Sequence, residues 1–266
     1  MASNSSSNQV TNLDLSSLSN DADTTQLDST RTNSALSIVA CKHEIDQTMI
    51  KHLQILQGFK IVIVCDDSGS KMNNFSDIKD TRRNDLCSIV KIVLDIGIIF
   101  DTNGVDIHFL NGEILSKVKY LETIDWIFAS PVNENKPLLF VLDGVFNSLL
   151  SQAEEETKLL LVVVSNGEVT DKNGNNSLHS FEQSMFARQS AEITYVSVFL
   201  YTDGLSHTGY FNEPGQTMKH VNVVGDFQRE KNDINRSGRS DYCSSFGNYV
   251  VRALLSAVDP ENQCLR

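Results

Sequence analysis

The sequence predicts a doubly wound α/β fold, in which helices flank a mostly parallel central sheet, and three observations lead to this class. Short β-branched runs alternate with amphipathic helical patterns along the chain from residue 59 onward. Two of these runs are continuously apolar, as expected for strands that are covered on both faces of a parallel sheet. The 266 residues are 40% hydrophobic, which is enough to build a sizeable core.

The elements follow from the periodicity of apolar residues. Four β-branched or apolar runs predict strands, over residues 60–65, 105–110, 159–165 and 193–200. Apolar residues at helical spacing predict helices over residues 44–57, 86–97, 138–149 and 250–258. Polar residues around Asp80 and Thr81 are placed to cap the second of these helices, and Pro260 follows the last. A short helix over 121–128 carries the only tryptophan, Trp126, which we expect to pack in the core.

Composition divides the chain into one domain and two tails. Residues 1–42 are rich in Ser, Asn, Thr and Asp, and the first aromatic residue of the chain is Phe59. Because such a segment buries little apolar surface, we expect a disordered tail there. Residues 43–260 should form a single domain, and residues 261–266 a short C-terminal tail. Within the domain, the polar segment 225–242 predicts a long loop or an exposed helix.

Charge and cysteine content limit the partners and the location. The chain has 22 Lys+Arg against 34 Asp+Glu, a formal net charge of −12, which disfavours nucleic acids and anionic membranes. Five scattered cysteines without CxxC spacing favour neither a disulfide framework nor a zinc site. The sequence shows no secretory signal and no membrane-spanning apolar run, so we expect a cytoplasmic protein.

One motif follows the first predicted strand directly. Asp66, Ser68 and Ser70 bring three oxygen donors together beside a glycine turn. Oxygen donors with one or two carboxylates are what hard cations such as Mg²⁺ prefer. The same residues are also typical of a helix N-cap and tight turn, in which short polar side chains bond to nearby backbone N–H groups. The pattern by itself leaves both readings open.

Residues 61–70 resemble the opening of a von Willebrand factor A (vWA) domain with its metal-ion-dependent adhesion site. The likeness extends to residues 106–111, 160–168 and 246–260, and so covers most of the chain from 59 to 260. More narrowly, the chain resembles an intracellular branch of this family found in fungi and protists. The resemblance implies a Rossmann-like sheet and a non-catalytic protein-binding module. It also implies Mg²⁺ or Mn²⁺ at Asp66, Ser68 and Ser70, where a partner's carboxylate often completes the coordination shell.

Two residues depart from the family pattern at this metal site. Lys136 stands where the family has a Thr, and Asn166 stands where it has an Asp. The second change removes a negative charge, and the first adds an ammonium that would repel a divalent ion by several kcal/mol at an effective dielectric constant of about 20. We therefore expect weak or lost metal binding. Either Lys136 pairs with Asp66 in place of the metal, or it lies on a flexible loop and a weak site survives.

Catalytic motifs are missing from the sequence. It contains no GxSxG elbow, no GxxxxGK[ST] loop and no GxGxxG turn. We therefore expect a protein that is not an enzyme and that binds a protein partner at the loops where the strands end. One alternative is a metal-independent structural scaffold whose partners bind another face. The other is a phosphatase-like hydrolase that uses Asp66 as its nucleophile, although Ser68 stands where that chemistry needs a second carboxylate.

Overall fold

A six-stranded sheet forms the centre of the fold. The computed structural model describes residues 16–66, 77–129, 136–150, 157–165, 173, 175, 178–188, 191–201, 218–236 and 245–260. Within them the strands are β1 (Phe59–Cys65), β2 (Val105–Phe109), β3 (Ile114–Val118), β4 (Lys158–Ser165), β5 (Thr194–Leu200) and β6 (Val221–Val224). Their order is β3-β2-β1-β4-β5-β6, and every neighbouring pair is parallel except the antiparallel pair β2–β3. The expected α/β class, with a mostly parallel sheet, is confirmed.

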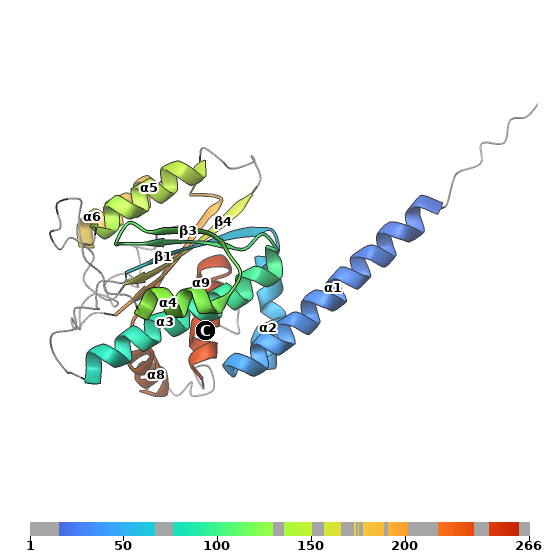
Figure 1. Ribbon diagram of the computed structural model, residues 1–266, viewed down its shortest axis with the longest axis horizontal. Helices are drawn as coiled ribbons and strands as arrows, with labels where there is room; N and C mark the ends of the chain where they lie inside the picture. Colours follow the sequence, from blue (N-terminus) through green and yellow to red (C-terminus); the bar gives the residue numbers. More distant parts are fainter. Residues whose placement is uncertain are drawn as a thin grey trace, which may run out of the picture.

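Helices cover both faces of the sheet (Figure 1). They are α1 (Ser16–His43), α2 (Gln47–Leu53) with the 3₁₀ turn Gln54–Leu56, α3 (Asp77–Phe100), α4 (Leu121–Ala129), α5 (Leu138–Leu150), α6 (Leu178–Ala187), α8 (Phe227–Arg236) and α9 (Phe246–Val258). One apolar core lies under α5 and α6, and the other lies under α3, α4 and α9. Strand β1 shows the division, because Ile61 and Ile63 enter the second core while Val62 and Val64 enter the first.

The four strands predicted from the sequence are β1, β2, β4 and β5, and the central ones are buried on both faces. In β1 and β4 all but one residue of each strand is buried, which is why their apolar runs are continuous. Strands β3 and β6 and helix α6 were not predicted from the sequence. Strand β3 is mostly exposed and β6 has only four residues, so neither leaves a clear pattern. The polar segment after residue 225 contains helix α8, the second of its two expected forms.

The first helix corrects the prediction of a disordered tail over residues 1–42. Residues 1–15 lie outside the described residues, but Ser16–His43 form helix α1. Its last turns pack against the domain, with Leu36, Val39 and Ala40 buried at helical spacing. The start of α1 extends beyond the body of the molecule (Figure 1). Three apolar residues within a polar sequence change the composition little. They stabilise the helix through contacts with residues far along the chain, which composition does not reveal.

An ionic contact holds the end of α1 against α3. Lys42 Nζ and His43 Nε2 each lie 2.7 Å from Asp95 Oδ2, and Asp95 is buried. Burial raises the pKa of Asp95, but the hydrogen bonds from His43 and Lys42 outweigh this effect and hold the pKa below its ordinary value. The carboxylate therefore stays charged where two donors meet it, and it joins the N-terminal helix to the domain.

The turn after α1 is seated on the start of α9. Glu44 takes a left-handed conformation with φ 54°, which ends α1, and its carbonyl accepts a 2.5 Å hydrogen bond from Ser245 Oγ. The Asp46 backbone N–H donates to Asn248 Oδ1 at 2.8 Å. The helix expected over residues 44–57 therefore begins only at α2. These bonds join two segments that lie about two hundred residues apart, so local periodicity could not reveal them.

Two smaller expectations were also wrong. Trp126 is 66% exposed, whereas Ile124 and Ile127 on the same helix face the core. Helix α3 begins at Asp77, so residues 80 and 81 lie inside it and do not cap it. None of the helices in the described part of the chain is long and apolar enough to cross a membrane.

Candidate functional site

Asp66 lies at the carboxyl edge of the sheet, where the motif placed it. Strands β1 and β4 are neighbours, and the ladder continues past β1 because the Asp66 backbone N–H donates to the Val164 carbonyl at 2.8 Å. Ser165 Oγ donates to Asp66 Oδ2 at 3.3 Å, and both residues are buried. The Tyr201 N–H in turn donates to the Ser165 carbonyl at 3.0 Å. The ends of β1, β4 and β5 therefore hold the Asp66 carboxylate in a fixed position.

Ser165 is a member of this site that sequence reasoning missed. The resemblance to the vWA family points instead to the next residue, Asn166. The pairing of Cys65 with Val164 brings Asp66 and Ser165 side by side. Knowledge that the first and third predicted strands are neighbours would have been enough to find the contact.

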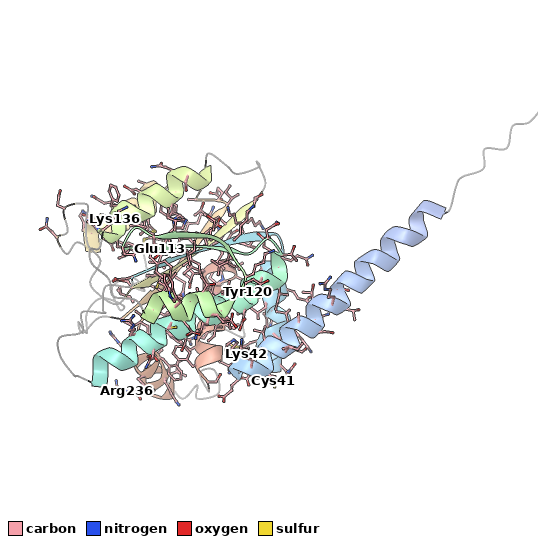
Figure 2. All side chains as sticks on the ribbon, viewed as in Figure 1. Cys41, Lys42, Glu113, Tyr120, Lys136 and Arg236 are labelled. Atoms are coloured by element: carbon pink, nitrogen blue, oxygen red, sulfur yellow. The ribbon has the colours of Figure 1, made fainter. Side chains whose placement is uncertain are left out.

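Lys136 does not pair with Asp66, which corrects one of the two arrangements expected for it. Its backbone N–H donates to the Leu110 carbonyl at 2.7 Å, just past the end of β2. Its ammonium nitrogen lies 2.8 Å from the point where a Cβ on Gly112 would stand, so the exposed side chain runs across the β2–β3 turn. Figure 2 shows Lys136 on the side of the molecule that carries Glu113 of this turn. The anchored backbone directs the side chain away from the β1 end.

The described donors provide little for a divalent cation. Ser68, Ser70 and Asn166 lie outside the described residues, so the structure places only Asp66 of the three predicted ligands. Within the described ranges, no three His, Cys, Asp or Glu side chains gather in a way that could hold a metal ion. Asp66 with the Ser165 hydroxyl offers one carboxylate and one neutral oxygen. Mg²⁺ or Mn²⁺ would be held weakly by such a set, because few charges offset the cost of removing its water.

A second polar group lies beside the β5 end. Tyr201 is 1% exposed, and its hydroxyl lies beside that of the buried Tyr249. Burial and the nearby Asp85 raise the pKa of Tyr201, so the phenol stays protonated. Burial, followed by the charge of Asp226, raises the pKa of Asp85 to about 6. Asp85 on α3 and Asp226 before α8 therefore form a pair of carboxylates that repel each other close to the carboxyl edge.

The raised pKa of Asp85 predicts a pH-dependent stability. The folded pKa of about 6 lies above the ordinary 3.8, so this group's contribution is full below pH 3.8 and is lost as the pH rises through 6. We expect Asp85→Asn to raise the free energy of unfolding by about 1 kcal/mol near pH 7.5, after a discount for solvent screening, and by about a third of that near pH 4.5. Urea unfolding at both pH values measures the effect. The exposed Glu122→Gln is the control, and an equal gain at both pH values would exclude ionisation as the cause.

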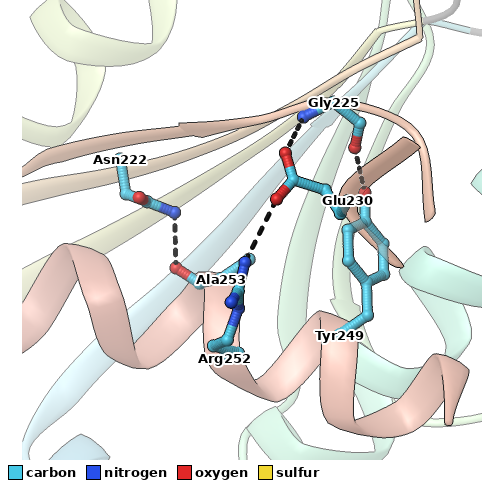
Figure 3. Close-up of polar contacts among 6 residues, drawn as sticks. All are labelled: Asn222, Gly225, Glu230, Tyr249, Arg252 and Ala253. Carbon is cyan, nitrogen blue, oxygen red and sulfur yellow. Dashed lines mark hydrogen bonds and ion pairs between the residues drawn. The ribbon is translucent and has the colours of Figure 1, made fainter. Parts of the chain in front are cut away.

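Hydrogen bonds fix the elements behind this group (Figure 3). Glu230 uses both carboxylate oxygens, accepting from the Gly225 N–H at 3.0 Å and from Arg252 at 3.1 Å. The Tyr249 hydroxyl donates to the Gly225 carbonyl at 2.6 Å, and Asn222 donates to the Ala253 carbonyl at 3.1 Å. These bonds connect the end of β6 to α8 and α9. The carboxyl edge is therefore a rigid surface on its β5–β6 side.

The described polar groups at this edge are suited to binding through hydrogen bonds. Among the described residues, the Ser165 hydroxyl is bonded to the Asp66 carboxylate, and the buried Tyr201 phenol, which stays protonated, follows the neighbouring β5. No family model matches this chain, and a comparison with curated proteins also found no match.

Proposed function

We propose that this chain is a non-catalytic, vWA-type protein-binding module that uses its strand-end face. This face is the carboxyl edge of β1, β4 and β5, built around Asp66. The observation that carries the proposal is the buried Asp66 carboxylate, held by Ser165 at the end of a central strand. Ligands of open α/β sheets bind at this edge, where loops from several strands converge.

The sheet order is compatible with a vWA domain, but other α/β folds also have a mostly parallel sheet flanked by helices. The motif from Asp66 to Ser70, on which the resemblance rests, begins at the end of β1. Strand β1 lies between β2 and β4, so the segments after β2 and β4 are the ones expected to flank it. The argument from fold to function is one of analogy, and the role of the site rests on its own residues.

Weak or lost metal binding is part of the proposal. Asp66, Ser68 and Ser70 would hold Mg²⁺ or Mn²⁺ if the site binds one, and the ion would supply a positive charge for a partner's carboxylate. The Lys136 ammonium lies against Gly112 of the β2–β3 turn and forms no ion pair with Asp66 in the described part of the chain. The replacement of Asp by Asn166 still leaves one negative charge fewer than the family pattern has. We expect a partner that contacts this face with little dependence on metal.

The partner should be a protein in the cytoplasm. The net charge of −12 disfavours phosphate backbones and anionic lipid surfaces. A metal-independent scaffold whose partners bind elsewhere is the competing proposal. The two proposals predict different results for substitutions at Asp66. If the chain is a scaffold, its partners stay bound when Asp66 is changed.

Site-specific photo-crosslinking in cells separates the two proposals. A photoreactive phenylalanine at Lys136, exposed near the carboxyl edge, should give a discrete adduct with a partner, whereas one at the exposed Glu192 should not. Asp66→Arg should reduce the adduct from position 136 at least tenfold, and chelation of divalent ions should leave it unchanged. Adducts that survive Asp66→Arg, or that form only at position 192, would contradict binding through the strand-end face.

A further inference from the structure

The open edge of β3 carries an exposed strip that the strand-end face does not use. Strand β3 is the last strand of the sheet and pairs only with β2 among the described strands. Leu115 pairs with Ile107, and the Phe109 N–H donates to the Glu113 carbonyl, so these alternate residues turn their backbone groups toward β2. By the alternation of an antiparallel ladder, the backbone groups of Ile114 and Ser116 face outward. They form a short template for one more strand, which ends where a register shift and the left-handed φ of 56° at Lys117 interrupt the ladder.

The side chains along this edge make a recognition surface. An open hollow of about 340 Å³ is lined by β3 and by the residues that lead into α4, including Lys119, Tyr120 and Thr123. Ile114 is 60% exposed and Tyr120 is 71% exposed. Exposed aromatic and aliphatic side chains around a hollow are the usual anchors of a bound peptide.

The charge of the β3 edge indicates which kind of segment would bind there. Lys117 and Lys119 are both exposed and, within the part of the chain that the structure describes, neither forms an ion pair. The carboxylate of Asp106 on the neighbouring strand is already used, because its two oxygens meet the Lys117 N–H at 2.9 Å and Lys60 Nζ at 3.2 Å. The two lysines leave positive charge on this edge in a chain with a net charge of −12. They complement acidic side chains on a partner.

A second copy of this chain fits the edge poorly. Pairing β3 with another β3 would bring two sets of lysines together, and like charges on facing strands are destabilising. Lysines on edge strands ordinarily prevent such self-association. Acidic side chains on a bound strand would be attracted to these lysines. The same lysines that repel a second copy of this chain therefore favour an acidic partner.

We propose that the β3 edge binds an acidic, extended segment of a partner protein. The segment adds to the sheet as a short strand beside Ile114 and Ser116, and its carboxylates pair with Lys117 and Lys119. Backbone hydrogen bonds to Ile114 and Ser116 supply a sequence-independent contribution, and the hollow beside Tyr120 takes one side chain. This surface is separate from the strand-end face and does not depend on the function proposed there.

Selection from a random peptide display library tests the inference directly. Peptides enriched on the full wild-type chain should carry net negative charge and bind Lys117→Glu/Lys119→Glu at least tenfold more weakly. The control Lys51→Glu/Lys158→Glu makes the same change of charge at two other exposed lysines and should keep wild-type affinity. No enrichment, enrichment without acidic bias, or equal loss in both double variants would overturn the proposal.

A pair of variants at one position tests strand addition. Ser116→Pro removes the outward N–H and should weaken the selected peptides at least tenfold, whereas Ser116→Ala keeps it and should bind normally. Thermal unfolding checks that both variants fold, and amide chemical shifts should map the peptide to β3. Shifts elsewhere, or equal binding by both variants, would contradict an added strand. A dimer of the free chain that Ser116→Pro dissolves would assign the edge to a second copy instead.

Discussion

Gly247→Ala should lower the free energy of unfolding by about 3 kcal/mol or more. A Cβ at this position would lie 2.0 Å from the His43 carbonyl oxygen, 3.0 Å from its carbonyl carbon and 2.8 Å from Ile45 Cγ1. Two of these atoms belong to the backbone and cannot turn away. Either α9 or the turn after α1 must move, and the hydrogen bonds that join Ser245 and Asn248 to this turn would be lost with it.

Urea unfolding of Gly247→Ala beside Gly144→Ala measures this effect. Gly144 lies in α5, where a Cβ would meet nothing within 4 Å, so its replacement should stabilise the helix by up to about 1 kcal/mol. The two variants make the same chemical change in helices and should move stability in opposite directions. An unfolding midpoint for Gly247→Ala equal to that of the wild type would mean that the α1–α2 turn does not rest on α9.

Gly104→Ala should cost a similar amount, about 3 kcal/mol, for two reasons that add. Gly104 has φ 104°, a conformation that residues with a side chain rarely adopt. A Cβ there would also lie 2.6 Å from the carbonyl carbon and oxygen of Lys117. The clash displaces the end of β3, so the proposed peptide-binding edge should be distorted as well.

Gly58→Ala separates the two reasons. Gly58 has φ 85°, and a Cβ there would meet nothing within 4 Å, so only the backbone conformation is penalised, at about 1 kcal/mol. The difference between the two variants in urea unfolding then measures the contact between Gly104 and β3. Equal losses would show that β3 does not pack against this glycine.

Burial on both faces explains how far the fold could be predicted. Strands β1 and β4 lie in the middle of the sheet, so their apolar runs and the position of Asp66 at the β1 end were readable from the sequence. Strand β3 was not, because Ser116 and Lys117 face solvent at an open edge and a register shift in its pairing with β2 interrupts the alternation. Trp126 was misplaced for a related reason, since residue type was weighed above its position on the helix.

Tertiary contacts explain the features of the fold and the site that the sequence did not predict. Helix α1 is held by a few buried residues and by Asp95, far along the chain, so composition alone favoured disorder. The side chain of Lys136 is directed by a backbone bond to Leu110, which a motif comparison does not contain. The Ser165 contact with Asp66 depends on strand order, which the sequence left open.

Thermal unfolding with divalent ions tests the central claim, a strand-end face with weak or lost metal binding, most directly. A ligand at about 100 times its dissociation constant adds about 2.7 kcal/mol, which in a chain of this size raises the midpoint by several degrees. We expect millimolar Mg²⁺ or Mn²⁺ to leave the wild-type midpoint at its value in EDTA, and to raise that of Lys136→Thr/Asn166→Asp. A rise of several degrees in the wild type that Asp66→Ala abolishes would contradict the account.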